Sequence, residues 1–160
     1  MKKIWLFVVV LFLSACAVKN PKTQNPPTQT MRILLSSPAI KINDMGFLRH
    51  EGGGLILQIY KLGKPLLALS VRDKICLNGA CYAKRIFNEK FFNHAHYDDF
   101  LSDILKARPL YAGKNLQKSP CGSTQVLEAK NYAIVYELCG ENVRFWDKIS
   151  RVRLQLTRQK

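Results

Sequence analysis

Two cysteines that flank an Asn-Gly pair place the strongest constraint on how this chain folds. Residues 76–81 read Cys-Leu-Asn-Gly-Ala-Cys, with the turn residues at the centre. Asn-Gly favours a two-residue type I′ turn, because both central residues of that turn need positive φ. Leu77 then pairs with Ala80, and Cys76 lies opposite Cys81 within the distance that a disulfide spans. The segment therefore predicts a hairpin closed by a Cys76–Cys81 disulfide.

A second pair of cysteines, Cys121 and Cys139, is centred on Lys130. A three-residue loop at 129–131, with Asn131 in the left-handed conformation, would bring the two sulfur atoms together across another hairpin. The four cysteines at 76, 81, 121 and 139 allow three pairings, and the two hairpins select this one. A metal site is the alternative, but the 76–81 spacing, with no nearby histidine, fits zinc poorly.

The first sixteen residues carry a targeting pattern. Lys2 and Lys3 precede an uninterrupted apolar run at 4–13, and Leu-Ser-Ala-Cys follows at 13–16. Ten helical residues rise about 15 Å, roughly half of a hydrocarbon core, so the run is a signal-peptide core rather than a spanning helix. This ordered pattern closely resembles the lipobox signal of bacterial lipoproteins. An ordinary secretory signal with a chance cysteine is the alternative.

The lipobox resemblance implies a modification and an address. Residues 1–15 would be removed as a signal peptide, and Cys16 would become a lipidated N-terminus carrying a diacylglyceryl group and usually an amide-linked acyl chain such as palmitate. Two or three acyl chains anchor a protein stably. An aspartate after the cysteine retains enterobacterial lipoproteins in the inner membrane, so Ala17 implies the periplasmic side of the outer membrane. An oxidising periplasm favours the two disulfides.

Behind the signal, the composition predicts a tether and one domain. Residues 16–31 hold prolines at 21, 26 and 27 among polar residues, which is typical of an extended, mobile linker. Residues 32–160 are long enough for a single domain but not for two. The apolar fraction of the whole chain, 48%, is too high for a disordered protein.

We expect residues 32–160 to form an α+β domain. Its predicted fold is a curved, half-barrel-like antiparallel sheet, with one main helix packed against it and two hairpin disulfides. The helix is predicted over 97–107, where Phe100, Leu101, Ile104 and Leu105 form an apolar stripe. Apolar, β-rich or alternating runs predict strands at 40–48, 55–62, 66–71, 75, 82–86, 126–128, 132–138, 143–146 and 152–156.

Residues that carry chemistry are scarce. The three histidines are His50, His94 and His96. The run 93–99 contains two of them and two aspartates, which makes a metal site conceivable, but we interpret it as a polar approach to the helix N-terminus. The chain has no nucleophile-elbow, HExxH, Walker or Rossmann pattern. The sequence therefore predicts a protein that is not an enzyme and holds no cofactor and no metal.

The formal net charge of +14 favours polyanionic partners. Basic residues gather near the C-terminus beside Phe145 and Trp146, and we expect four of them to contact anionic lipid or lipopolysaccharide: Arg144, Lys148, Arg151 and Arg153. Val152, Leu154 and Leu156 alternate with the bases and are expected to point inward. The alternative is an ordinary solvated face. Nucleic acid is a poor partner for a periplasmic lipoprotein.

The order of elements behind the tether also resembles a family. Antiparallel strands, a helix that ends in Leu105-x-x-Arg108-Pro109-Leu110, and further strands are similar to the LolB/LolA-like lipoprotein carriers. The resemblance implies a curved sheet closed by helices around an apolar cavity that takes acyl chains. This chain departs from the pattern because it lacks a helix after the tether and has two disulfides. Residues 45–48 would be either a membrane-inserting loop, as in such carriers, or the end of the first strand, which we prefer.

Two functions are consistent with these features. The first, which the resemblance to LolB/LolA-like carriers implies, is an outer-membrane lipoprotein that binds or transfers lipid or acyl-chain ligands. The second is an anchored structural or interaction module of a cell-envelope complex, with a protein partner and no ligand cavity. An enclosed apolar pocket between the sheet and the helix would support the first, and a fully packed sheet would support the second.

Overall fold

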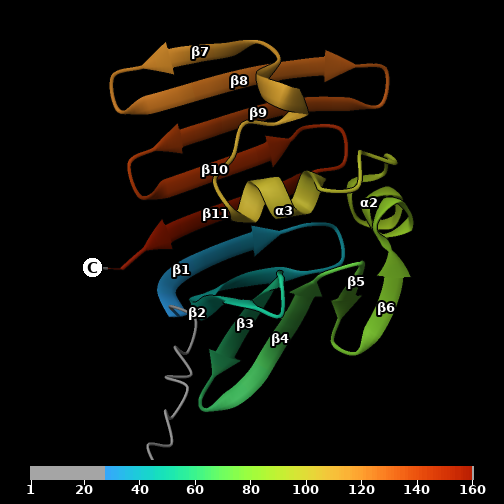
Figure 1. Ribbon diagram of the computed structural model, residues 1–160, viewed down its shortest axis with the longest axis vertical. Coiled ribbons are helices and arrows are strands. Elements are labelled where there is room, and N and C mark those ends of the chain that lie inside the picture. The colour runs from blue at the N-terminus through green and yellow to red at the C-terminus, as the bar shows by residue number, and fades with distance from the viewer. Residues whose placement is uncertain (1–27, 160) are drawn as a thin grey trace, which may run out of the picture.

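A single eleven-stranded antiparallel sheet forms most of the molecule (Figure 1). The computed structural model describes residues 28–159, so the predicted signal peptide, Cys16 and most of the predicted tether lie outside the described part. The strand order is β6-β5-β4-β3-β2-β1-β11-β10-β9-β8-β7. Strands at the two ends of the sheet run in clearly different directions in Figure 1, so the sheet is strongly twisted.

The chain builds the sheet in two halves. The first half consists of β1 (Thr28–Ser36), β2 (Lys41–Glu51), β3 (Gly54–Lys61), β4 (Lys64–Val71), β5 (Lys74–Leu77) and β6 (Ala80–Ala83). The second half consists of β7 (Leu116–Ser119), β8 (Gly122–Ala129), β9 (Tyr132–Cys139), β10 (Asn142–Asp147) and β11 (Val152–Arg158). Between the halves come α2 (Lys84–Phe92), α3 (Phe100–Leu105) and the short 3₁₀ turn η1 (Tyr111–Gly113).

The topology explains where the helices lie. The first meander runs outward from β1 to the edge strand β6, and the second runs inward from the opposite edge strand β7 to β11, which pairs with β1. The chain must therefore pass from one edge of the sheet to the other between β6 and β7. It does so across one face, and α2 and α3 lie along this crossing (Figure 1). We call residues 84–115 the strap, and the sheet face beneath it the inner face.

The fold-class prediction was wrong. Strands make up 58% and helices 14% of the described residues, so the domain is mostly β with two helices rather than α+β with one main helix. Residues 82–86 were predicted to form a strand, whereas β6 ends at Ala83 and α2 begins at Lys84. Helix α2 has no side-chain cap and no acidic residue in its first turn, so it carries none of the usual start signals.

The other helix is shorter than predicted. Helix α3 covers Phe100–Leu105 instead of 97–107. At its end Ala107 has a φ of 54°, which stops the helix two residues after Leu105. At its start Asp99 makes no capping hydrogen bond and instead pairs with Lys84 of α2 at 2.8 Å. The aspartates that suggested a capped first turn thus serve an interhelical contact.

Strand β1 was not expected. It begins at Thr28, inside the stretch that the sequence analysis assigned to the tether, and Met31 is buried with 1% of its surface exposed. β1 is the central strand that joins the two halves, because it pairs with β2 on one side and β11 on the other. The residues 45–48 lie within β2, as we preferred, and not in a loop.

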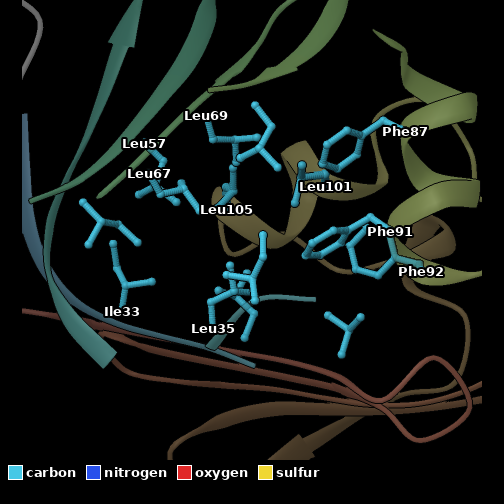
Figure 2. A pocket seen from close by; sticks show the side chains of 15 residues that line it. Ile33, Leu35, Leu57, Leu67, Leu69, Phe87, Phe91, Phe92, Leu101 and Leu105 are labelled. Atoms are coloured by element: carbon cyan, nitrogen blue, oxygen red, sulfur yellow. The ribbon is translucent and has the colours of Figure 1, made fainter. Parts of the chain in front are cut away.

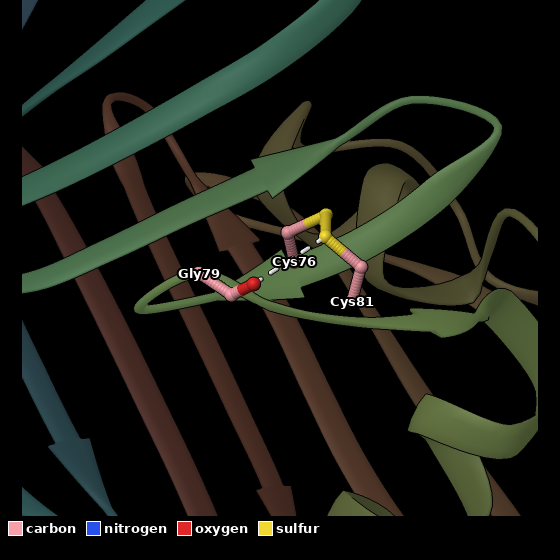
Figure 3. The surroundings of a disulfide bond; sticks show 3 residues. All are labelled: Cys76, Gly79 and Cys81. Atoms are coloured by element: carbon pink, nitrogen blue, oxygen red, sulfur yellow. Dashed lines mark hydrogen bonds between the residues drawn. A yellow bond between two sulfur atoms is a disulfide. The ribbon is translucent and has the colours of Figure 1, made fainter.

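Both predicted disulfides are present. Cys76 and Cys81 face each other across β5 and β6, with their Cα atoms 3.9 Å apart (Figure 3). The turn between them has the expected positive φ at Asn78 (48°) and Gly79 (89°). Asn78 also accepts a hydrogen bond from the amide of Ala68 at 2.8 Å, which fixes the hairpin to β4.

The second disulfide forms with a different register from the predicted one. Cys121 and Cys139 are bonded, with a Cα–Cα distance of 4.8 Å. Their hairpin turns at only two residues, since Ala129 pairs with Tyr132, and Asn131 is not among the residues with positive φ. Cys139 therefore pairs with Gly122, and Cys121 lies immediately before the first residue of β8.

Candidate functional site

The inner face of the sheet and the strap enclose an entirely apolar pocket (Figure 2). Its floor comes from five strands and the connection between β1 and β2, and its roof comes from both helices. The side chains that line it are Ile33, Leu35, Ile40, Leu57, Ile59, Leu67, Leu69, Leu77, Phe87, Phe91, Phe92, Leu101, Leu105, Val152 and Leu154. No polar side chain is among them, so the pocket can recognise a ligand only by its apolar surface and shape.

Alternation along the strands builds the floor. In a strand, successive side chains point to opposite faces, so residues two apart share a face. Ile33 and Leu35 of β1, Leu57 and Ile59 of β3, and Leu67 and Leu69 of β4 follow this rule, and all six are buried. Val152 and Leu154 continue the floor on β11, which confirms the predicted inward direction of these residues.

Helical spacing builds the roof. Phe87 and Phe91 are four residues apart on α2, which places them on one side of the helix, and Phe92 lies next to them. Leu101 and Leu105 have the same spacing on α3. Figure 2 shows the labelled side chains of both helices directed toward those of β1, β3 and β4. The three phenylalanines were not among the predicted site residues, although apolar residues at 87, 91 and 92 fit a helical face.

The pocket is almost filled by its own lining. Its free volume is about 30 Å³, which matches the space of one water molecule. Sites for small-molecule ligands are usually about 300 Å³ or more. A ligand the size of an acyl chain therefore enters only if the strap moves away from the sheet or the lining side chains rearrange.

Few polar contacts hold the strap. Within the strap, the buried side chain of Asn88 on α2 donates to the carbonyls of His96 (3.3 Å) and Tyr97 (3.0 Å), which joins α2 to the loop between the helices. The strap is bonded to β8 at the end that leads into β7, where Asn115 donates to the carbonyl of Val126 (3.1 Å) and the buried side chain of Gln125 contacts the strap backbone. The amide group of Gln125 donates to the carbonyls of Leu110 (3.0 Å) and Lys114 (2.7 Å) and accepts from the amide of Leu110 (2.7 Å).

A buried histidine lies in the loop between the helices. His96 has 1% of its surface exposed and stacks on Phe100 of α3 at a centroid distance of 3.8 Å. Its Nδ1 is hydrogen-bonded to the hydroxyl of Tyr111 at 2.5 Å, while its Nε2 is buried without a partner among the described residues. Burial, assisted by the nearby His94 and opposed by the smaller effect of Asp147, lowers the pKa of His96 to about 4. His96 is therefore neutral at neutral pH.

The arrangement of the histidines does not favour a metal site. The rings of His94 and His96 are 4.7 Å apart, but the Nδ1 of His96 is occupied by Tyr111. Among residues 28–159 no group of three or more potential metal-ligating side chains comes together. Asp147 is buried nearby, and its carboxylate is already satisfied by the Ser150 hydroxyl at 2.6 Å and by two backbone amides.

The four bases that were predicted to contact anions lie on or near the outer face, which is the face of the sheet opposite the strap. Arg144 pairs with Glu137 at 3.5 Å, and both side chains remain well exposed. Lys148 and Arg153 both lie over the ring of Trp146. Arg151 lies in the turn between β10 and β11 with a φ of 60°, so it shares no strand face with Arg153.

Several large apolar side chains are exposed on the first half of the sheet. Leu62, at the tip of the β3–β4 hairpin, has 96% of its surface exposed and is flanked by Lys61 and Lys64. Met45 (40%) and Phe47 (38%) are exposed on β2. Residues 45–48 were one predicted candidate for membrane contact. Leu62 was not, because its exposure depends on the hairpin turn at 62–63.

In the part of the chain that the structure describes, no helix has the length and apolar character needed to cross a bilayer. No protein-family model matches the chain, and no curated protein sequence is significantly similar to it.

Proposed function

We propose that this protein is a lipid-anchored periplasmic protein of the outer membrane that takes up an acyl chain between the inner face of its sheet and the strap. The observation that carries the proposal is the lining of the pocket, in which all fifteen side chains are apolar. A floor of aliphatic residues under a roof of phenylalanines matches the surface of a hydrocarbon chain and offers nothing to a polar ligand. The proposal assigns no catalytic role to any residue.

The way in which the strap is held supports uptake by opening. The strap crosses the inner face as one continuous connection, and its side-chain hydrogen bonds to the sheet are concentrated at one end, at Gln125 and Asn115. Apolar contacts with the floor are non-directional, so an acyl chain can replace them without leaving polar groups unpaired. In the absence of a ligand the strap closes and the pocket shrinks to its small free volume.

The exposed side chain of Leu62 supports contact with a membrane during uptake of the acyl chain. A leucine that is 96% exposed between two lysines has no packing role within the described residues. An apolar tip with adjacent bases suits insertion at the surface of a bilayer that carries anionic lipids. The lipobox resemblance supplies the anchor that would keep the hairpin close to such a surface.

A photo-crosslinking experiment in the full-length chain tests the proposal. Phe91, in the roof of the pocket, is replaced by p-benzoylphenylalanine, and Tyr82 on the edge strand β6 is replaced in the same way as a matched aromatic control. We expect irradiation of cells to attach a lipid or an acylated protein at position 91 and not at position 82, as measured by mass spectrometry. Equal labelling at both positions, or none at position 91, would contradict the proposal.

The small free volume favours a second candidate function. A pocket of about 30 Å³ is also what a fully packed core would contain, so the protein would then be an anchored interaction module of an envelope complex. In that case the residue at position 91 stays inside a closed core and crosslinks only within the chain. Partner proteins would be crosslinked instead from exposed positions such as 82.

A further inference from the structure

The outer face of the sheet carries a hollow that is separate from the apolar pocket under the strap. It is about 320 Å³ in volume and lies over β1, β11, β10 and β9. The strand register places two rows of side chains across it. One row contains Leu34, Gln155, Arg144 and Glu137, and the adjacent row contains Ser36, Arg153, Trp146 and Val135. Residues of both rows line the hollow, so aliphatic, aromatic and basic groups meet at one place.

Trp146 is the central feature of this face. It is 37% exposed, so part of its indole is accessible on the outer face. The guanidinium of Arg153 lies 4.2 Å from the centroid of its ring, and the ammonium of Lys148 lies 5.6 Å from it. Stacking on the indole holds the guanidinium in one orientation while its N–H groups remain free to donate.

The bases around Trp146 are not neutralised within the described chain. Neither Lys148 nor Arg153 forms an ion pair with any residue of 28–159. Arg144 has a partner in Glu137, but an exposed pair at 3.5 Å contributes little and exchanges readily for a stronger anion. The face therefore presents up to three cations around one amphipathic ring.

We propose that this outer-face cluster, Arg144, Trp146, Lys148 and Arg153, docks the protein on the phosphate head groups of an anionic bilayer. Arginine forks bind phosphate oxygens in pairs, and tryptophan favours the boundary between head groups and acyl chains. Each base close to an anionic surface strengthens binding roughly fivefold. Docking by this face is independent of the inner pocket and would leave the strap directed away from the bilayer.

The fluorescence of Trp146 can report docking of this face, because the chain has only one other tryptophan, Trp5. The full-length chain with Trp5→Phe is reconstituted into vesicles of phosphatidylcholine alone or of equal parts phosphatidylcholine and phosphatidylglycerol. Both kinds of vesicle contain brominated phosphatidylcholine, which quenches tryptophan on contact. We expect quenching of Trp146 in the anionic vesicles, little in the neutral ones, and a loss of quenching at high salt because salt screens the attraction.

Paired variants separate a specific site from general basicity. Lys148→Gln with Arg153→Gln should lower the ratio of docked to undocked protein roughly 25-fold and abolish the quenching. Lys74→Gln with Lys118→Gln removes the same charge from exposed positions on β5 and β7. This control variant should retain the quenching of Trp146. Thermal melts confirm that both variants are folded.

Three results would overturn the proposal: equal quenching in neutral vesicles, no quenching in either, or an equal loss in both paired variants. None of these bears on the inner pocket, so the crosslinking from position 91 and the docking of the outer face succeed or fail separately.

Discussion

At the scale of single residues, His96 makes the stability of the fold depend on pH. Burial lowers its pKa from 6.5 to about 4 in the folded chain. The unfolded chain therefore binds more protons between these two values, and stability falls as pH decreases through this window. The stabilisation is fully present above about pH 6.5 and is lost by about pH 4. The difference corresponds to roughly 3 kcal/mol.

The first prediction follows from this linkage. Denaturant unfolding of His96→Gln should show a flatter dependence on pH between 6.5 and 4 than the unmodified chain, because the variant has no imidazole to protonate. His50→Gln, which changes an exposed histidine on β2, serves as the control and should retain the original dependence. An unaltered slope in His96→Gln would mean that other groups dominate acid unfolding.

At this scale, the sequence predicted the burial of some residues but not the contacts of others. The alternation of Val152, Leu154 and Leu156 predicted their burial correctly, because a strand with one buried face repeats every two residues. The role of Gln125 could not be predicted in this way. Its three hydrogen bonds go to Leu110 and Lys114, which approach it only when the strap has crossed the sheet.

At the scale of elements, the two disulfides should contribute unequally to stability. Both close antiparallel hairpins, but the sequence separation is 18 residues for Cys121–Cys139 and 5 for Cys76–Cys81. A disulfide restricts the unfolded chain more when it closes a longer loop. The chain-entropy relation gives about 3 kcal/mol for the longer loop and about 2 kcal/mol for the shorter one.

The second prediction compares the two bonds directly. Replacing Cys121 and Cys139 by serine should lower the free energy of unfolding more than replacing Cys76 and Cys81, as measured by denaturant titration of the two double variants. The serines are matched in size and polarity, so the comparison isolates the cross-links. A larger loss from the shorter hairpin would show that its bond to β4 through Asn78, rather than loop closure, determines the effect.

Elements were predictable where the local sequence alone determines them. The Asn78–Gly79 turn, the amphipathic stripe of α3 and most strands of the second half were found because each depends on neighbouring residues. Helix α2 and strand β1 were missed because tertiary contacts decide them. α2 is helical although it has no cap, since its phenylalanines pack on the inner face, and β1 is a strand because partners on both sides complete it.

At the scale of the whole molecule, the pairing of β1 with β11 brings the two ends of the described chain to the middle of the sheet. The strap, by contrast, joins the two outer edges. Opening the strap therefore need not separate the central strands, and the hydrogen bonds of the sheet can persist while the pocket enlarges. Sequence patterns could not reveal this pocket, because its floor and roof come from segments that lie far apart along the chain.

The last prediction concerns the anchor that the lipobox pattern implies. Cys16→Ser removes the only thiol that could receive a diacylglyceryl group in that motif, so palmitate labelling should disappear and the protein should leave the membrane fraction. Each buried methylene contributes about 0.8 kcal/mol, so no surface contact of this domain could replace two or three acyl chains. The fold should be unaffected, because position 16 precedes the first strand by twelve residues. Labelled palmitate and membrane fractionation measure the first effect, and the non-reducing mobility of the disulfide-bonded chain measures the second.

Ala15→Ser, which keeps the cysteine and a small residue before it, is the matched control and should remain labelled. Continued labelling of Cys16→Ser would remove the anchor from the proposed function, whereas docking through Trp146 would still be testable on the same vesicles.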